Sequence, residues 1–149
     1  MKTIRSLGFL RGFTLGLMTV FAPMGLYAQS ACPQESRTLN GPYVTHATGS
    51  IGGAPIAVVG VTTYDGHGNF TFSATISFNG SVSKGSGSGT YTVNRDCTGS
   101  QNFGPEIAHY DFVVNGGGRE ITYIQTDPGT VVTVTSTRLG PALIRARAN

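Results

Sequence analysis

Apolar and polar residues alternate in short runs along the chain after residue 38, and glycine-rich turns separate these runs. No stretch in this region has the period of an amphipathic helix. Successive side chains of a strand point to opposite faces, so the clearest run places five apolar side chains on one face: Phe70, Phe72, Ala74, Ile76 and Phe78. The pattern predicts an all-β domain in which this face belongs to the core or to the wall of a lumen.

Eight segments have strand character: residues 43–50, 56–64, 70–78, 85–93, 99–103, 108–114, 120–126 and 131–138. The connections are rich in Gly, Asn, Asp and Pro, which supply the positive φ values and preset corners of hairpin turns. The run Ile56–Val61 is continuously apolar and is predicted to be buried on both faces. The glycine-rich stretch 84–89 is interpreted as a flexible entry to the fourth strand.

Successive hairpins without helical crossovers predict an antiparallel meander, which must hide its edges by stacking or by closing. The first and last segments lack dense protective charge, so we expect residues 131–138 to pair with an early strand. The predicted fold is one antiparallel eight-stranded β-barrel over residues 29–138. Side chains fill such a barrel, or it holds one small ligand. The inward face of most strands stays undetermined, because a one-residue shift in a hairpin loop reverses every side chain.

The N-terminus has the plan of a secretory signal peptide. Lys2, Arg5 and Arg11 precede an apolar run of fifteen residues, Gly12–Leu26, which is shorter than a membrane-spanning helix and contains Pro23. We predict a signal peptide over residues 1–28, a secreted or periplasmic mature protein, and no stable membrane insertion after cleavage. Residues 139–149 have no strand pattern and are predicted to form a flexible tail.

Cleavage of the predicted signal peptide would change the net charge of the chain. The whole chain has ten Lys and Arg residues against seven Asp and Glu residues. Three of these cations belong to the predicted signal peptide, which leaves seven charges of each sign in a mature chain of about 121 residues. A neutral chain offers no long-range attraction to polyanions, so nucleic acid is not expected as a partner.

Two cysteines, Cys32 and Cys97, lie at the start of the mature chain and in a polar turn. Cysteines of small exported proteins usually pair, and neither a Cys-x-x-Cys motif nor a Cys/His cluster indicates metal or redox chemistry. We predict a Cys32–Cys97 disulfide. A free reactive thiol and a metal ligand are the alternatives. Closing a loop of 65 residues is worth about 4 kcal/mol in the chain-entropy model.

One cysteine and six segments of the chain resemble known proteins. They are Cys32, Leu39–Tyr43, Val59–Asn69, Ser88–Gly99, Asp111–Val114, Gly117–Ile121 and Thr126–Thr130. In these segments the chain resembles a group of small secreted bacterial β-barrel proteins, which implies secretion and a small barrel but no activity. By analogy of fold, such barrels are similar to calycins and to the allene oxide cyclase barrel. Calycins stack an arginine over an early tryptophan, and here Tyr43 and Arg138 take those places.

Candidate chemistry is sparse. His109 and Asp111 share a strand face, and the next hairpin brings Glu120 toward them, so an acid–base pair is conceivable. A solvated or structural pair is the alternative, and no nucleophile motif accompanies the group, so no catalytic residue is assigned. His46 and His67 fit no zinc spacing. Residues 65–69 lack the carboxylates of a calcium loop, and stretch 84–89 lacks the helix of a phosphate cradle. Neither a metal nor a cofactor is predicted.

Three classes of function remain. The first is a binding module for a small apolar or amphipathic molecule, in which Phe72, Asp111, Glu120 and Tyr123 are the predicted contacts. The second is a cofactor-free cyclase or isomerase that uses carboxylates in the lumen. The third is a structural or surface-interaction protein with a filled barrel. The first class is our expectation, and an open lumen would separate it from the third.

Overall fold

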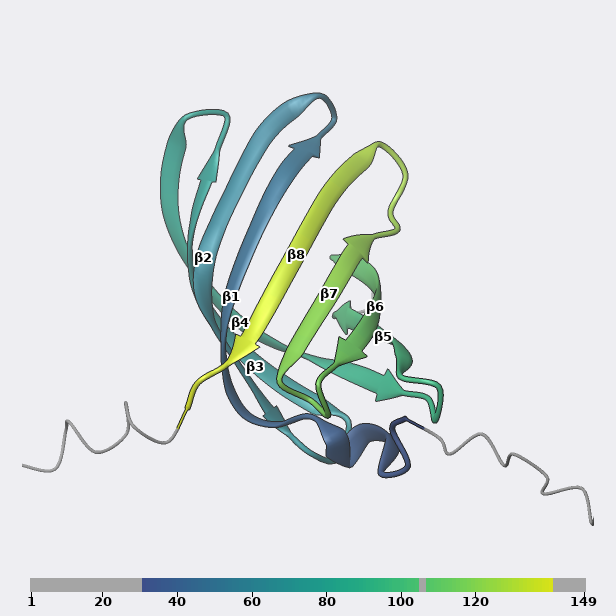
Figure 1. Cartoon of the computed structure of the whole chain (residues 1–149). Helices are drawn as coiled ribbons and strands as arrows, with labels where there is room; N and C mark the ends of the chain where they lie inside the picture. The colour runs from purple at the N-terminus through teal and green to yellow at the C-terminus, as the bar shows by residue number, and fades with distance from the viewer. Residues whose placement is uncertain (1–30, 105–106, 141–149) are drawn as a thin grey trace, which may run out of the picture.

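The computed structural model of the chain describes residues 31–104 and 107–140. The predicted signal peptide, residues 1–28, lies outside the described residues, as does the predicted tail from residue 141 on. A 3-10 helix, η1 (Glu35–Thr38), precedes eight strands. The strands are β1 (Asn40–Ile51), β2 (Ala54–Asp65), β3 (Asn69–Phe78), β4 (Ser81–Val93), β5 (Thr98–Phe103), β6 (Ala108–Asn115), β7 (Glu120–Gln125) and β8 (Thr130–Arg138) (Figure 1).

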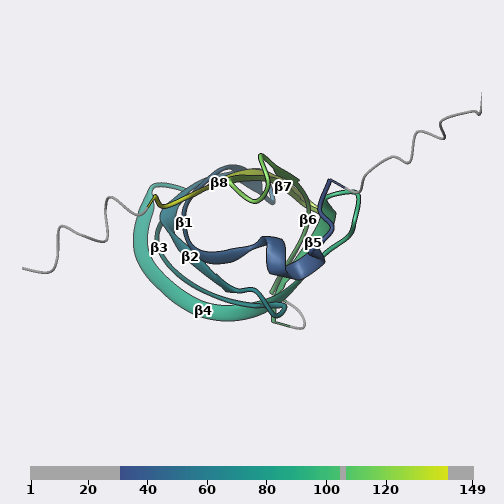
Figure 2. The same ribbon diagram turned by 60° about the horizontal axis from the view of Figure 1, so that its bottom comes forward.

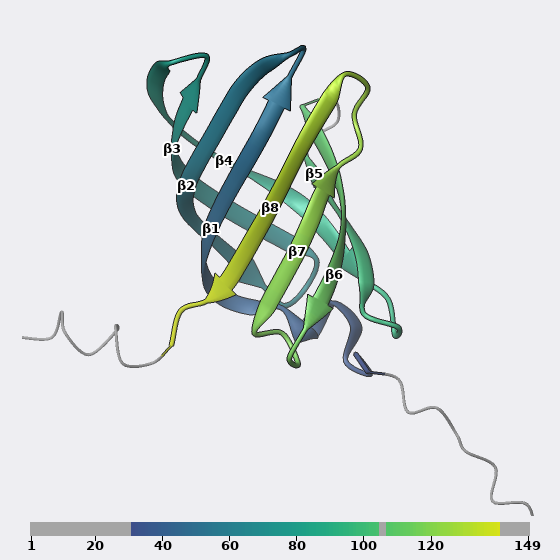
Figure 3. The ribbon, with the colours of Figure 1, turned by 45° about the horizontal axis from the view of Figure 1, so that its top comes forward.

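The strands form one closed antiparallel barrel in chain order, which confirms the predicted fold. Each strand pairs with the next, and β8 returns to β1 in a register that sets Ala47 opposite Val134. Figure 3 shows β8 lying between β1 and β7. All eight predicted segments are strands, and β1, β2 and β4 extend beyond their predicted limits. Every strand has a neighbour on both sides, but β4 pairs with β5 only over Thr90–Val93. Among the described residues, Ser81–Gly89 therefore pair with β3 alone.

The alternation along β3 places one face of the strand inside the barrel, as predicted. Phe70, Phe72, Ala74 and Ile76 contribute to the interior of the barrel. The prediction for Ile56–Val61 is wrong, because β2 alternates between partly buried and exposed residues. Val59 and Val61 are 49% and 40% exposed. A barrel of a single sheet has only one buried face, so every second side chain of an apolar run must point to solvent.

The glycine-rich stretch 84–89 is a regular part of β4, and its prediction as a flexible strand entry is wrong. Two of its glycines lie beneath aromatic rings. A Cβ at Gly89 would lie 2.6 Å from the ring of Phe70, and a Cβ at Gly87 would lie 2.9 Å from the ring of Phe72. The missing side chains therefore make room for the phenylalanines of the neighbouring strand.

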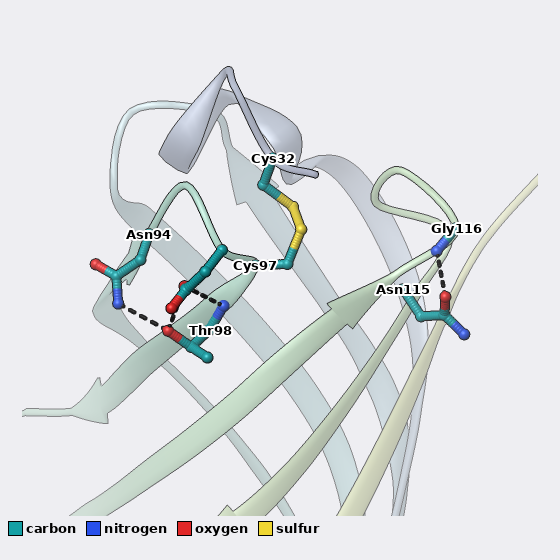
Figure 4. Close-up of a disulfide and its surroundings, with 7 residues drawn as sticks. Cys32, Asn94, Cys97, Thr98, Asn115 and Gly116 are labelled. Atoms are coloured by element: carbon teal, nitrogen blue, oxygen red, sulfur yellow. Dashed lines mark hydrogen bonds between the residues drawn. A yellow bond between two sulfur atoms is a disulfide. The ribbon is translucent and has the colours of Figure 1, made fainter. Parts of the chain in front are cut away.

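One end of the barrel is covered by the N-terminal segment. Figure 2 shows η1 across this end. Cys32 and Cys97 form the predicted disulfide, with a Cα–Cα distance of 5.1 Å, and both are buried (Figure 4). The Tyr91 hydroxyl lies 2.8 Å from the carbonyl oxygen of Ser36 and 2.9 Å from that of Leu39. The segment is thus fastened to the barrel by a covalent bond at one point and by a phenol at another.

The expected arginine–aromatic pair is present at the same end. The guanidinium carbon of Arg138 lies 5.7 Å from the centre of the Tyr43 ring, within the range of a cation–π contact. Arg138 also donates a hydrogen bond to the carbonyl oxygen of Asn40. The Tyr43 hydroxyl donates to the carbonyl oxygen of Gly118 at 2.6 Å. These contacts join the last strand, β8, to the first strand, β1, and join β1 to the β6–β7 loop.

Candidate functional site

The barrel interior changes along its length from filled to hollow. Along β1, the inward residues Tyr43 and Ala47 are 0% and 7% exposed, whereas Ile51 is only partly buried. At the far end of β3, Phe78 is 41% exposed. Solvent therefore reaches inward-facing positions at the end formed by the β1–β2 and β3–β4 hairpins. We call this the open end, and the end covered by η1 the capped end.

A cavity of about 280 Å³ occupies the half of the barrel nearest the open end. It is larger than the cavity of about 150 Å³ that accommodates benzene in an engineered protein core. Its wall is mostly aliphatic on β1, β2, β3 and β8: Ala47, Ile51, Ile56, Val58, Ala74, Ile76, Val132 and Val134. No Asp, Glu, Lys, Arg or His of the described chain lines it.

Aromatic side chains cover part of the remaining wall. The Phe103 ring lies 4.9 Å from that of Phe72 and 5.5 Å from that of Tyr110, both in edge-to-face geometry. Such pairs add about 0.5–1.5 kcal/mol beyond their burial. Phe103 also contacts Phe70, whose ring is 4.8 Å away, so these rings continue into the filled half.

Hydrogen-bonded phenols form the floor of the cavity. The Tyr64 hydroxyl donates to Gln101 Oε1 at 2.6 Å and lies 2.5 Å from the Tyr123 hydroxyl. Burial is the main cause that raises the pKa of Tyr64 well above its ordinary value and that of Tyr123 to about 12. Both phenols are therefore neutral at physiological pH and act as hydrogen-bonding groups.

Three hydroxyl groups continue this floor toward β1, β2 and β8. The Thr45 hydroxyl lies 2.7 Å from that of Ser136 and 3.0 Å from that of Thr62. Ser136 and Thr62 are buried. Every fully buried side-chain nitrogen or oxygen within the described ranges has a hydrogen-bond partner. The hydroxyl groups of the floor are thus hydrogen-bonded to one another, as buried polar groups generally are.

A second polar group joins the cavity wall to the β7–β8 loop. Gln125 Nε2 donates to Asp127 Oδ2 at 2.8 Å, and Asp127 Oδ1 lies 2.7 Å from His109 Nδ1. The hydrogen bonds from His109 and Gln125 lower the pKa of Asp127 to about 2, so the carboxylate is ionised at neutral pH. Tyr110 lies beside Gln125, and burial followed by the charge of Asp127 raises its pKa to about 12.

The four predicted contact residues divide between the two faces of the barrel. Phe72 and Tyr123 line the cavity. Asp111 and Glu120 are exposed, and their strands turn them outward, because the inward positions beside them are Phe112 and Ile121. The expected lumen carboxylates are therefore absent among the cavity-lining residues. The hairpin register decides this outcome, since the alternation on β6 and β7 allows either face.

His109 and Asp111 do share the outer face of β6, as predicted, but the imidazole pairs with Asp127 of the β7–β8 loop. Asp111 instead borders a hollow of about 620 Å³ on the outside of the barrel. Another outer hollow, of about 720 Å³, is lined mainly by Thr, Ser, Asn and Asp side chains. Both lack the apolar enclosure that retains a small molecule.

The loop at residues 65–69 is a turn. Asp65 Oδ1 accepts backbone hydrogen bonds from His67 and Asn69, at 2.7 and 3.0 Å, and Oδ2 accepts one from the Asn69 side chain at 2.8 Å. These bonds lower the pKa of Asp65 to about 2. His46 and His67 are exposed. Within residues 31–104 and 107–140, no group of three or more His, Cys, Asp or Glu is placed to hold a metal ion.

Sequence reasoning missed the four buried polar residues that border the cavity: Thr62, Gln101, Gln125 and Ser136. The sequence contained one indication for Gln101. It lies two residues before Phe103 on the same predicted strand, so both side chains point to the same face. A polar residue in an otherwise apolar row is the pattern that marks a buried polar contact. Without the register, the same pattern fits an outward row equally well.

Comparisons with known proteins add no assignment: no family model, no curated protein and no solved structure matches this chain. No helix in the described part of the chain has the length and apolar character needed to cross a bilayer.

Proposed function

We propose that the protein binds a small, largely apolar molecule in the barrel cavity and does not transform it. The cavity itself carries this proposal: about 280 Å³ of space, walled by aliphatic and aromatic side chains, in a barrel whose other half is densely filled. Ligand sites are typically concave and apolar with a few fixed polar groups, and this cavity has that composition.

The two alternatives have less support. A cyclase or isomerase that uses lumen carboxylates requires acidic side chains in the cavity, and Asp111 and Glu120 lie outside it. A structural protein with a filled barrel does not require an apolar hollow in the half of the barrel nearest the open end. Leaving such a hollow costs stability, because the lining atoms lose packing partners.

We propose further that the protein acts in an extracytoplasmic compartment. The Cys32–Cys97 disulfide is consistent with an oxidising environment. The sequence pattern of a signal peptide supports the same compartment. Fractionation of the producing cells, followed by intact mass under non-reducing conditions, tests both points. We expect the exported species to lack residues 1–28 and to have no free thiol.

Ligand binding can be tested with naphthalene as an apolar probe. The chain contains no tryptophan, so naphthalene emission can be followed against tyrosine alone. We expect saturable one-to-one binding. Val58→Trp places an indole in the cavity, whereas Val59→Trp places the same group on the outer surface one residue away. Val58→Trp should weaken binding at least about tenfold, equivalent to about 1.4 kcal/mol, and Val59→Trp should leave it within about twofold.

Equal effects of the two substitutions would contradict the proposed site, and absence of saturable binding to the unsubstituted protein would contradict the function. Thermal unfolding of both variants controls for loss of the fold. Since both substitutions lie in the middle of β2 and introduce the same residue, any nonspecific effect on the strand should appear in both.

A further inference from the structure

The amide of Gln101 has a defined orientation at the edge of the cavity. Its oxygen faces the Tyr64 hydroxyl at 2.6 Å, a separation usual for O–H···O bonds and shorter than the range for N–H···O bonds. The Nε2 group therefore points away from Tyr64. Gln101 is only 3% exposed and lines the cavity, and no described residue accepts a hydrogen bond from its Nε2. Within the described residues its donors thus have no partner, and they lie at the cavity surface.

Gln125 presents the opposite chemistry. Its Nε2 must face Asp127, because an ionised carboxylate can only accept hydrogen bonds, and the N···O distance is 2.8 Å. Its Oε1 then faces the Tyr110 hydroxyl, which is 3.5 Å away. Gln125 Nε2 is thus engaged by Asp127 outside the cavity, whereas Gln101 Nε2 has no acceptor among the described residues.

These side chains form one row across three neighbouring strands. Gln101 is paired in register with Tyr110, and Tyr110 with Gln125, so the three lie side by side on β5, β6 and β7. The aliphatic residues of β1, β2 and β3, including Ala47, Val58 and Ala74, line the same cavity from other strands. A bound molecule would therefore meet hydrogen-bonding groups on one side and hydrocarbon on the other.

From this arrangement we propose that the ligand is an uncharged molecule with an apolar body and a carbonyl-type oxygen that accepts a hydrogen bond from Gln101 Nε2. The proposal rests on the ligand-binding function proposed above and names its ligand class. It makes Gln101 the residue that determines specificity. Free donors at a buried site discriminate strongly, because a ligand without an acceptor leaves them unpaired.

The lining also disfavours charged ligands. No cationic side chain of the described residues borders the cavity to pair with a carboxylate, and no anionic one borders it to pair with an amine. Transferring an isolated charge from water into an apolar cavity is very costly. An anion with the same ring system as a neutral ligand should consequently bind at least about a hundredfold more weakly.

Four probes with one ring system test the ligand class on the full mature protein. They are naphthalene, 2-acetylnaphthalene, 2-isopropenylnaphthalene and 2-naphthoate, and calorimetric titration measures each affinity. The second and third differ only in a carbonyl oxygen replaced by a methylene. We expect the ketone to bind about three- to tenfold more tightly than the isopropenyl compound, the range for one net hydrogen bond. We expect 2-naphthoate to show the weakest binding.

Two matched variants locate the donor. Gln101→Met removes the unpaired N–H groups at nearly constant volume. Gln125→Met makes the same change in the same row, where Nε2 is bonded to Asp127. Gln101→Met should abolish the preference for the ketone while retaining naphthalene binding. Gln125→Met should retain the preference. The probe series on the unsubstituted protein decides the ligand class even where Gln101→Met fails to fold.

The outcomes separate this inference from the function on which it rests. Naphthalene binding without a preference for the ketone overturns the inference and leaves the binding function intact. A preference that survives Gln101→Met overturns the role of Gln101. Tighter binding of 2-naphthoate than of the ketone overturns the uncharged class. Failure of every probe to bind contradicts both the function and the inference.

Discussion

The two ends of this barrel are built from the same strands, but the interior is filled at one end and hollow at the other. Toward the capped end, the inward residues of β1, β2 and β7 are Tyr43, Tyr64 and Ile121, and each is at most 1% exposed. Toward the open end, the inward residues of β1 and β2 are Ile51 and Ile56, which are only partly buried. Large side chains and a covering segment fill the first half, whereas smaller side chains leave the second half hollow. Under the proposed function, stability and binding belong to different ends of one sheet.

The difference follows from residue size and from the N-terminal segment. The capped half contains linked aromatic pairs, such as Tyr43 with Tyr64 at 5.3 Å and Tyr64 with Tyr91 at 4.9 Å. Leu39, directly after η1, is fully buried there. The described residues place no comparable segment over the open end. Four experiments test this division, from the largest expected effect to the smallest.

Removing the disulfide should have the largest effect. Replacing Cys32 and Cys97 with serine frees a loop of 65 residues, which should lower the free energy of unfolding by about 4 kcal/mol. Urea denaturation measures the change. Because the bond lies at the capped end, the naphthalene affinity of the protein that remains folded should change by less than about twofold. A collapse of affinity in fully folded protein would show that the two ends are coupled.

Truncating one isoleucine at each end compares the packing directly. Ile121→Ala should lower the free energy of unfolding by about 3 kcal/mol, because Ile121 is fully buried. Ile56→Ala should lower it by less than about 1.5 kcal/mol, because Ile56 borders an existing cavity. Denaturation midpoints and slopes of both variants provide the measurement. Similar losses would mean that the open end contributes as much packing as the capped end.

Removing the Tyr91 hydroxyl, which binds the N-terminal segment at the capped end, should have a smaller effect on stability. Tyr91→Phe leaves the carbonyl groups of Ser36 and Leu39 without this hydroxyl, so we expect a loss of about 1 kcal/mol. The amide of Leu39 should exchange with solvent faster, as detected by hydrogen exchange. Tyr110→Phe is the matched change at the open end, where the hydroxyl makes a bond of 3.5 Å. It should leave exchange at Leu39 unaltered.

Acid should destabilise both ends slightly. The folded pKa values of Asp65 at the capped end and Asp127 at the open end are about 2, below the ordinary value of 3.8. Each carboxylate therefore contributes stability that is present above pH 4 and is lost as the pH falls toward 2. Asp127→Asn and Asp65→Asn should each make the urea midpoint less dependent on pH in this window. An unchanged pH profile in both variants would contradict the hydrogen-bonded role of these carboxylates.

Much of the fold was predictable from the sequence because it depends on local patterns. Turn residues and alternation along the chain located all eight strands, and two cysteines in a chain predicted to be exported implied one disulfide. The face of β3 was also predictable, since apolar residues occupy every second position: Phe70, Phe72, Ala74 and Ile76. These features need only the covalent chain, the two-residue period of a strand and the compartment that the N-terminal pattern predicts.

The candidate site depended on the tertiary structure. Whether Asp111 or Phe112 points inward is decided by the pairing of β5 with β6 and of β6 with β7, and both choices satisfy the alternation. The pairing of His109 with Asp127, 18 residues away, likewise follows from the barrel's loops. The sequence by itself determined the strands, their order and the disulfide. Only closure of the sheet set the register, because register depends on contacts between strands, and the register decided which side chains surround the cavity.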